Sequence, residues 1–138
     1  MINEILKLST QLHPALQYVP APSTGKASPA QPVLFGVDDS PEVVDDLFEK
    51  LQIQFPAAGP VYAATQTWNL MNWQIAYLSV LSVQGVGILP DLIKARQSTA
   101  FNSVYGYNLD RSTFQIGRSR HLIRIAAEQI LHLADIYF

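Results

Sequence analysis

The stretch LQIQFPAAGPVYAATQTWNLMNWQIAYLSVLSVQGVGILP, from Leu51 to Pro90, contains no Lys, Arg, Asp or Glu. A helix that faces water normally keeps a charged face, so this stretch must be covered by the rest of the protein, by lipid or by a partner. It also carries uncharged polar side chains, namely Thr65, Gln66, Thr67, Asn69, Asn72, Gln74, Ser79, Ser82 and Gln84. Buried amides cost roughly 1–3 kcal/mol each when they lack a partner. These groups therefore either hydrogen-bond internally or line a cavity that binds something.

The size and composition of the chain indicate one domain, residues 1–138. On folding, a chain of 138 residues buries about 68–70% of the surface that its unfolded state exposes, so it needs no disulfide or metal to stabilise it. The sequence has no Cys, which excludes disulfides, thiolate metal sites, cysteine nucleophiles and Cys-ligated iron–sulfur clusters within this chain. The absence of Cys is also compatible with a reducing cytosol.

Charge and hydropathy narrow the classes of function. Only 14% of the residues are charged, against ~25% in typical soluble domains, and the formal net charge of -2 argues against a nucleic-acid binder. The best candidate for a membrane span, Ile75 to Leu89, is shorter and more polar than the ~20 apolar residues required. The N-terminus lacks the apolar core of a signal peptide. We therefore expect a cytoplasmic protein with no membrane span.

Hydrophobic periodicity predicts helices at four places in the chain. They are an amphipathic helix within 1–18, one that starts at Ser40–Pro41 with Ser40 as its cap, a central helix from Pro60 or Val61 to about Gln84, and a last helix over 119–137. The central helix has apolar groups all round, so we expect it to be buried. Gly85-Val86-Gly87 is expected to end it.

Between the helices, the sequence predicts a loop and a small sheet. Four prolines between Pro20 and Pro32 predict a surface loop over 20–32. The apolar run 33–37 is typical of a short buried strand. Alternation over 101–108, a turn, and the segment 113–116 predict one small β-hairpin. The expected fold class is α+β, mainly helical, with a buried uncharged central helix, that hairpin and a C-terminal helix.

A cationic cluster precedes and begins the last helix. Arg118, Arg120, His121 and Arg124 crowd its start, where free N–H groups and the helix dipole already favour anions. Guanidinium groups there would bind carboxylate, phosphate or catecholate oxygens. The alternative is that these cations pair with the acidic helix over 40–50, because the charges match in number and sign.

No catalytic or metal site stands out in the sequence. The acidic run 38–49 lacks the ligand alternation and glycine turn of a calcium loop and reads as a solvated helix face. His121 and His132 are separated by roughly 16 Å of helical rise and cannot share a metal. Trp68 and Trp73 point about 140° apart on a helix, which favours two core anchors over an aromatic clamp. We therefore expect no metal, no cofactor and no self-contained catalytic site.

The segment from Thr67 to Val80, TWNLMNWQIAYLSV, continues to GILPDL at 87–92 and is followed by VYGY at 104–107. It resembles the "W-x-L…W-Q-…-Y-L" helix, the "P-x-L" segment and the "GY" strand of siderophore ferric-iron reductases related to FhuF. The resemblance covers about residues 60–110, and its matched positions include Trp68, Trp73 and Gln74. It implies an intracellular role in iron acquisition and contact with a ferric siderophore.

The same family carries a [2Fe–2S] cluster on C-terminal cysteines, which this chain lacks, so no reductase activity is expected from this chain alone. The favoured function is binding an anionic ferric chelate near the cationic cluster, with aromatic groups against its apolar faces. The ligand-binding residues predicted for it are Arg118, Arg120, His121, Arg124, Trp68, Trp73 and Gln74. The alternative is a small protein-binding module, of inhibitor or immunity type, that neutralises a basic partner. A homodimer that buries part of the uncharged stretch fits either function.

Overall fold

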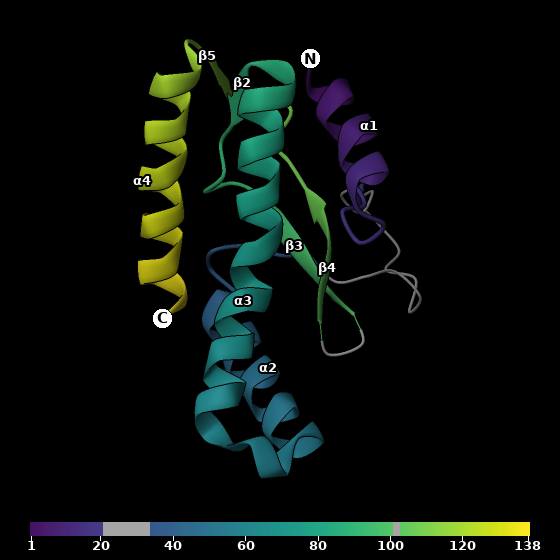
Figure 1. The fold of residues 1–138 in the computed structure, drawn as a ribbon, viewed down its shortest axis with the longest axis vertical. Helices are drawn as coiled ribbons and strands as arrows, with labels where there is room; N and C mark the ends of the chain where they lie inside the picture. The colour runs from purple at the N-terminus through teal and green to yellow at the C-terminus, as the bar shows by residue number, and fades with distance from the viewer. Residues whose placement is uncertain (21–33, 101–102) are drawn as a thin grey trace.

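The computed structural model describes residues 1–20, 34–100 and 103–138 (Figure 1). Most of these residues are helical, as the sequence predicts, and the described helices are α1 (Ile2–Leu12), α2 (Ser40–Gln54), α3 (Gly59–Val80) and α4 (Ser119–Tyr137). A 3-10 turn, Pro56–Ala58, links α2 to α3, and a π-helical turn, Leu81–Val86, extends α3. Most of the loop predicted over 20–32 lies outside the described residues.

Helix α3 is the central element, as predicted. It runs along the long axis of the molecule between α4 and α1 in Figure 1. Pro60 lies in its first turn, where the fixed φ of proline suits a helix start. At the other end Gly87 adopts φ 78° and its N–H donates to the Ser82 carbonyl at 2.8 Å. A left-handed residue of this kind favours glycine, so the predicted stop is confirmed.

Burial of α3 is confined to one face. Met71, Ile75 and Leu78 are buried in the core, whereas Val61 is 79% exposed and Val80 is 63% exposed. The expectation that the whole helix is enclosed is therefore correct for one face only. The other face remains at the surface although it has no charged residue, because α2, α4 and the sheet contact only part of its circumference and α1 lies against the π-helical turn that follows α3.

The sheet structure consists of two small antiparallel units in the described residues. β1 (Leu34–Phe35), β3 (Arg96–Ala100) and β4 (Ser103–Asn108) form one sheet in the order β1-β3-β4. β2 (Ile88–Pro90) pairs with β5 (Phe114–Ile116) in a second sheet. A short strand was predicted within 33–37, and β1 confirms it.

The predicted pairing of 101–108 with 113–116 is wrong. β4 instead pairs with β3, with Arg96 opposite Asn108 and Gln97 opposite Tyr107, while β5 pairs with β2. Two features explain the difference. Strand β3 is polar and shows no apolar alternation, so it is inconspicuous in the sequence. After β4 the chain turns around Asp110, which accepts hydrogen bonds from Ser112 and Thr113 and leads the chain away from β4.

The N-terminal segment forms a helix and then an extended strand-like run. α1 ends at Leu12, earlier than the predicted limit of 18, because His13 is extended and Pro14 cannot continue the hydrogen-bond ladder. The backbone after Pro14 lies along β4: the Gly106 N–H donates to Ala15 and the Tyr107 N–H donates to Gln17. This contact anchors α1 to the sheet.

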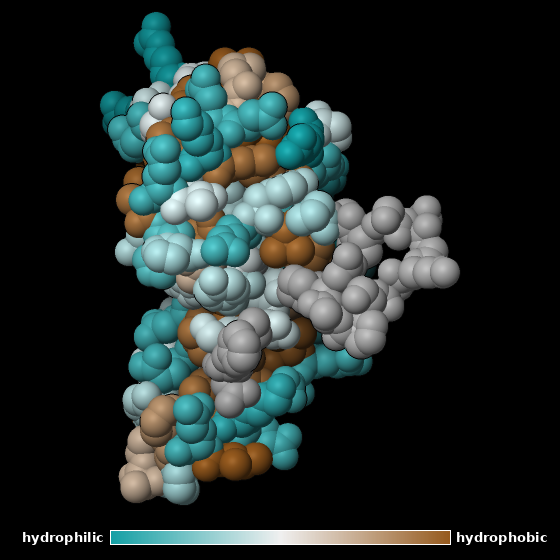
Figure 2. All heavy atoms as spheres, turned by 90° about the vertical axis from the view of Figure 1, so that its right-hand side faces the viewer, coloured by the Kyte–Doolittle hydropathy of each residue, from teal (hydrophilic) through white to brown (hydrophobic). Residues whose placement is uncertain are grey.

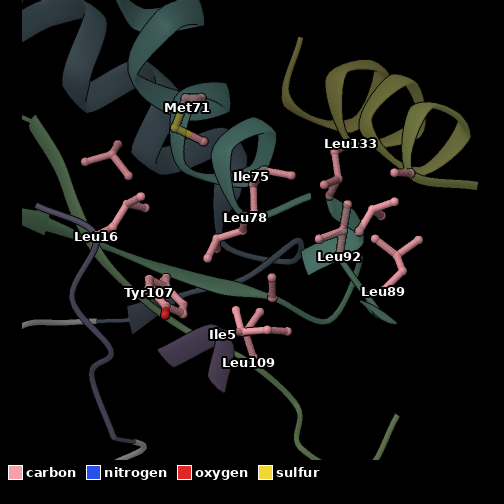
Figure 3. Packing of buried hydrophobic residues seen from close by; sticks show 14 of the residues in the cluster. Ile5, Leu16, Met71, Ile75, Leu78, Leu89, Leu92, Tyr107, Leu109 and Leu133 are labelled. Atoms are coloured by element: carbon pink, nitrogen blue, oxygen red, sulfur yellow. The ribbon is translucent and has the colours of Figure 1, made fainter. Parts of the chain in front are cut away.

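One hydrophobic core joins the helices to the sheets (Figure 3). Ile5 of α1, Ile75 and Leu78 of α3, Tyr107 of β4 and Leu133 of α4 are all buried within it. Full burial of an aliphatic side chain contributes about 1.5–3 kcal/mol. This core therefore fixes the position of α4, and with it the cationic cluster at the start of that helix.

The outer helices begin close to where the sequence places them. α4 covers 119–137 as predicted. α2 starts at Ser40, but the residue before the helix is Asp39, and the Ser40 hydroxyl donates to the Val37 carbonyl at 2.8 Å instead of capping the helix. Within the described segments, no helix is both long and apolar enough to cross a membrane.

Candidate anion-binding site

The cationic cluster forms one hollow on the surface. Arg118, Arg120, His121 and Arg124 together line it, with a volume of about 420 Å³. Arg118 is extended and precedes the first turn of α4, Arg120 and Arg124 are one helical turn apart, and His121 lies between them. All four side chains are exposed. The sequence prediction that these residues cluster is therefore correct in geometry.

The backbone adds to the positive character of this hollow. The N–H groups of His121 and Leu122 both donate to the Arg118 carbonyl, at 2.9 and 3.1 Å. The N–H groups that precede these two in the first turn have no acceptor within the helix. In addition, the N-terminal end of a helix carries roughly half a positive charge. An anion in the hollow would meet guanidinium groups and backbone donors together.

The alternative interpretation, in which this cluster pairs with the acidic helix over 40–50, is contradicted by the structure. In the described residues, Lys50 pairs with Asp46 of the same helix at 2.6 Å, and Arg124 approaches Glu128 at 3.9 Å. The start of α4 and the helix α2 lie at opposite ends of the long axis, so the Arg cluster and the α2 acids cannot meet within one molecule (Figure 1). Since both side chains of the Arg124–Glu128 contact are more than two-thirds exposed, it contributes little.

The two tryptophans do not lie at this hollow. Trp68 is 45% exposed, and its ring lies 4.9 Å from that of Phe138, at the far end of α4 from Arg118. Trp73 is half-buried against the core, where its Nε1 donates to the Val104 carbonyl at 3.1 Å. The expected pair of core anchors is thus correct for Trp73 and wrong for Trp68, because α3 turns Trp68 toward its exposed face.

Gln74 is a buried structural residue rather than part of the hollow. Its Nε2 donates to the Gln97 side chain and to the Gly106 carbonyl, both at 3.0 Å. Three other amides of the uncharged stretch, Asn69, Asn72 and Gln84, are exposed or half-exposed instead of buried. Among the described residues, the buried amides are Gln74 and Gln97. Gln97 lies in a polar segment of the sequence, which gave no signal that this residue would be buried.

A second polar hollow was missed by the sequence prediction. It has a volume of about 570 Å³ between the start of α2 and the end of β4, and its charged lining residues are Asp38, Asp39, Lys94, Arg96 and Asp110. These residues come from three separate segments of the chain, so only the tertiary structure brings them together. Both signs of charge occur in it, which makes it less selective for anions than the Arg cluster.

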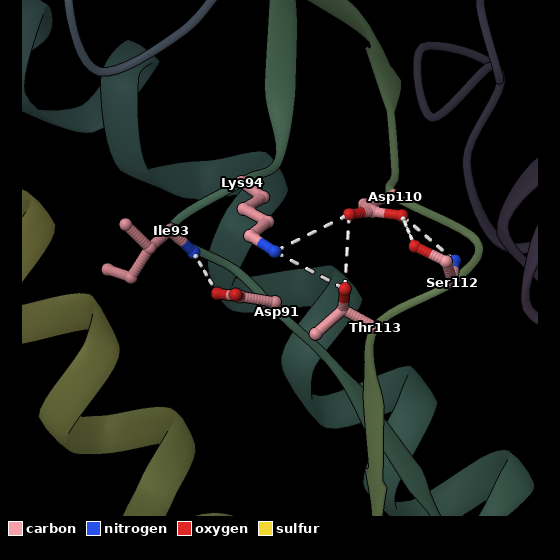
Figure 4. Close-up of polar contacts among 6 residues, drawn as sticks. All are labelled: Asp91, Ile93, Lys94, Asp110, Ser112 and Thr113. Carbon is pink, nitrogen blue, oxygen red and sulfur yellow. Dashed lines mark hydrogen bonds and ion pairs between the residues drawn. The ribbon is translucent and has the colours of Figure 1, made fainter.

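Asp110 organises one wall of this second hollow (Figure 4). Its carboxylate accepts from the Ser112 hydroxyl at 2.6 Å, the Ser112 N–H at 2.9 Å and the Thr113 hydroxyl at 3.1 Å, and Lys94 lies 3.7 Å away. The hydrogen bond from the Ser112 hydroxyl, followed by that from its N–H, lowers the pKa of Asp110 to about 2. Asp110 is therefore a turn-forming carboxylate that stays ionised.

In the described residues, no three His, Cys, Asp or Glu side chains are grouped closely enough to hold a metal ion. His13 instead packs its ring 5.3 Å from that of Trp73. No family model matches the chain, and no solved structure matches its fold. The evidence for the candidate site is therefore its own geometry.

Proposed function

We propose that this protein is a binding protein for a multiply anionic small ligand, held at Arg118, Arg120, His121 and Arg124. The observation that carries this proposal is the convergence of those four cationic or cationisable side chains on one surface hollow. In the part of the chain that the structure describes, the acidic helix neutralises none of them. A ligand with two or more anionic oxygens would engage several guanidinium groups at once, and each charge-assisted hydrogen bond contributes about 1.5–3 kcal/mol.

We further propose an anionic ferric chelate as the ligand class. The resemblance of about residues 60–110 to siderophore ferric-iron reductases supports this choice, and catecholate and carboxylate chelators present several anionic oxygens on one face. The chelate would be held by these four residues without the tryptophans, because Trp68 and Trp73 lie away from the hollow.

Calorimetric titration with ferric catecholate, hydroxamate and carboxylate siderophores tests the proposal. We expect at least one of them to bind below millimolar concentration. Arg118→Ala combined with Arg124→Ala should weaken that binding by about tenfold or more. The matched control is Lys50→Ala with Arg111→Ala, which removes the same charge from exposed positions elsewhere. If the control weakens binding equally, net charge rather than this hollow attracts the ligand.

Two outcomes would contradict the proposal at different levels. If no chelate binds below millimolar concentration but inorganic phosphate or a polycarboxylate does, the hollow is an anion site and the iron role is wrong. If a chelate binds and the arginine double variant binds it equally well, the ligand class is right and the site is elsewhere.

The alternative function, neutralisation of a basic protein partner, relies on α2. Its acidic residues are exposed, and among them Asp46 is paired with Lys50. The same calorimetric assay, run with a basic protein in place of the chelate, distinguishes the two functions. Binding through α2 would be lost in Asp45→Asn with Glu49→Gln and retained in the arginine double variant. Binding of a ferric chelate should show the opposite response.

A further inference from the structure

Helix α3 presents an exposed, uncharged stripe along the length of the molecule. The residues of this stripe are all exposed or half-exposed, and we call them the α3 stripe: Val61, Thr65, Trp68, Asn69, Asn72, Ala76 and Val80. Most of them recur at intervals of three or four positions, which places them on one side of a helix. An exposed helix face normally carries charges, and this one has none. Such a face is suited to burial against another surface.

Two apolar hollows flank the α3 stripe at its two ends. One has a volume of about 630 Å³, and its lining includes Leu12, Tyr77 and Val80, where α1 meets the end of α3. The other, of about 580 Å³, is lined in part by Trp68 and Phe138. Figure 2 views the side of the molecule that carries α1, and hydrophobic atoms reach the surface there between hydrophilic ones. Exposed apolar surface therefore extends beyond the α3 stripe itself.

We propose that the α3 stripe is the interface of a homodimer, in which α3 of one copy packs antiparallel against α3 of a second copy. An uncharged face can meet its own copy without burying a charge, and so avoids the desolvation cost of several kcal/mol that each buried ion carries. Two-fold symmetry makes such an interface isologous, so that residue i contacts residue j of the partner and j contacts i.

Antiparallel symmetry gives this interface a definite register. If Val61 of one copy packs against Val80 of the other, Thr65 lies opposite Ala76, and Asn69 lies opposite Asn72. The two most exposed valines, at 79% and 63%, then cover each other. The two asparagines meet near the symmetry axis, where their amides can hydrogen-bond across the interface; an Asn in such a seam is a known determinant of register.

The charge distribution favours this antiparallel orientation over a parallel one. The arginines at the start of α4 and the carboxylates of α2 lie at opposite ends of the long axis along which α3 runs (Figure 1). An antiparallel pair places the cationic end of each copy beside the anionic end of the other, whereas a parallel pair places like charges together. This electrostatic term is long-range and falls with salt, so it orients the encounter more than it holds the dimer.

Chemical cross-linking tests the register directly, because the chain has no native Cys. Val61→Cys and Val80→Cys are combined in one chain and treated with a short bis-maleimide at low micromolar protein. We expect a covalent dimer from the double variant and none from either single variant, since positions 61 and 80 lie far apart within one helix. A covalent dimer from Val61→Cys alone would indicate a parallel pair and overturn the proposal.

Charge exchange at the second pair of the register gives an independent test. Thr65→Glu and Ala76→Lys, each at an exposed position, should each raise the dimer dissociation constant at least tenfold by analytical ultracentrifugation. The double variant should recover most of the loss, because the introduced carboxylate of one copy then pairs with the introduced ammonium of the other. Leu131→Glu, which adds one charge at a 67% exposed position of α4, is the matched control. Wild-type protein that is monomeric up to 100 micromolar, or a control that dissociates as readily as Thr65→Glu, would overturn the proposal.

Discussion

The side-chain amide of Gln74 in α3 donates a 3.0 Å hydrogen bond to the side-chain oxygen of Gln97 in β3, and both residues are buried. Gln74 also donates to the Gly106 carbonyl of β4, and Gln97 donates to the Met71 carbonyl of α3. The two amides thus tie the central helix to both long strands of the sheet. Their burial is tolerable because most of their polar atoms are paired, although the Gln74 oxygen has no partner among the described residues.

Replacing Gln74 with Leu should destabilise the protein by about 2–6 kcal/mol, because it leaves the Gln97 oxygen and the Gly106 carbonyl without their donor, at about 1–3 kcal/mol for each buried group. Guanidinium unfolding monitored by circular dichroism measures the change. Gln84→Leu, on the exposed end of the same helical region, is the control and should stay within about 0.5 kcal/mol of wild type. Equal stability of the Gln74 variant and the control would show that the amide pair contributes nothing.

The two tryptophans of α3 should differ in their importance for stability. Trp73→Ala should cost about 3 kcal/mol, because it opens a cavity against the core and leaves the Val104 carbonyl unpaired. In the monomer, Trp68→Ala should cost about 1 kcal/mol, close to the contribution of its aromatic contact with Phe138. Chemical unfolding of both variants measures the difference. A larger loss of stability for the Trp68 variant than for the Trp73 variant would contradict the deeper burial of Trp73.

Asp110 should titrate well below an ordinary aspartate. Its pKa is lowered from 3.8 to about 2, first by the hydrogen bond from the Ser112 hydroxyl. Because the pKa in the folded state lies below that in the unfolded state, its contribution to stability is complete above about pH 4 and disappears as the pH falls toward about 2. Carboxyl-carbon NMR measures the titration directly.

Two variants separate the causes of this shift in the pKa of Asp110. Ser112→Ala removes the largest cause and should raise the pKa more than Thr113→Val, which removes a smaller one. Asp110→Asn should make the free energy of unfolding less dependent on pH between about 4 and about 2. If Ser112→Ala leaves the titration midpoint at about 2, the turn geometry around Asp110 is wrong.

The helices were predictable from the sequence because their signals are local. The start of α4 follows Gly117, and its apolar residues recur at helical spacing. α3 ends where Gly85-Val86-Gly87 predicts, because Gly87 takes a positive φ that few other residues adopt. The clustering of Arg118, Arg120 and Arg124 was equally predictable, since their spacing alone places them around one helix start.

The sheet pairing and the roles of the α3 side chains depend on long-range contacts, and the sequence did not reveal them. The buried positions of β3 include the polar residues Gln97 and Ser98. The strand therefore lacks the apolar alternation by which a strand is recognised in a sequence. Gln74 was predicted to bind ligand through a family resemblance, whereas its position 3.0 Å from Gln97 makes it structural. The Arg cluster lies far from the α2 acids because of how α4 is oriented relative to α2. The number and sign of charges in the sequence do not reveal that orientation.

Gly106 and Gly87 form a matched pair of glycines that differ in their surroundings. Both adopt positive φ, 89° and 78°, so alanine at either position meets the same backbone strain, about 1–2 kcal/mol. The surroundings differ. A Cβ at Gly87 would have no heavy atom of the described residues within 4 Å, whereas a Cβ at Gly106 would lie 2.8 Å from Val19 Cγ2 and 3.4 Å from the Gln17 carbonyl oxygen. Val19 cannot retreat easily, because its N–H donates to the Tyr107 carbonyl at 2.7 Å.

Gly106→Ala should therefore destabilise the protein by about 1–3 kcal/mol more than Gly87→Ala, the additional loss being the cost of overpacking. Thermal and guanidinium unfolding of the two variants measure it. Val19→Ala should recover part of the loss when combined with Gly106→Ala, since it removes the clashing methyl group, and should recover nothing when combined with Gly87→Ala. Equal losses for the two glycine variants, or no recovery by Val19→Ala, would mean that residues 15–19 do not lie against β4 as the structure places them.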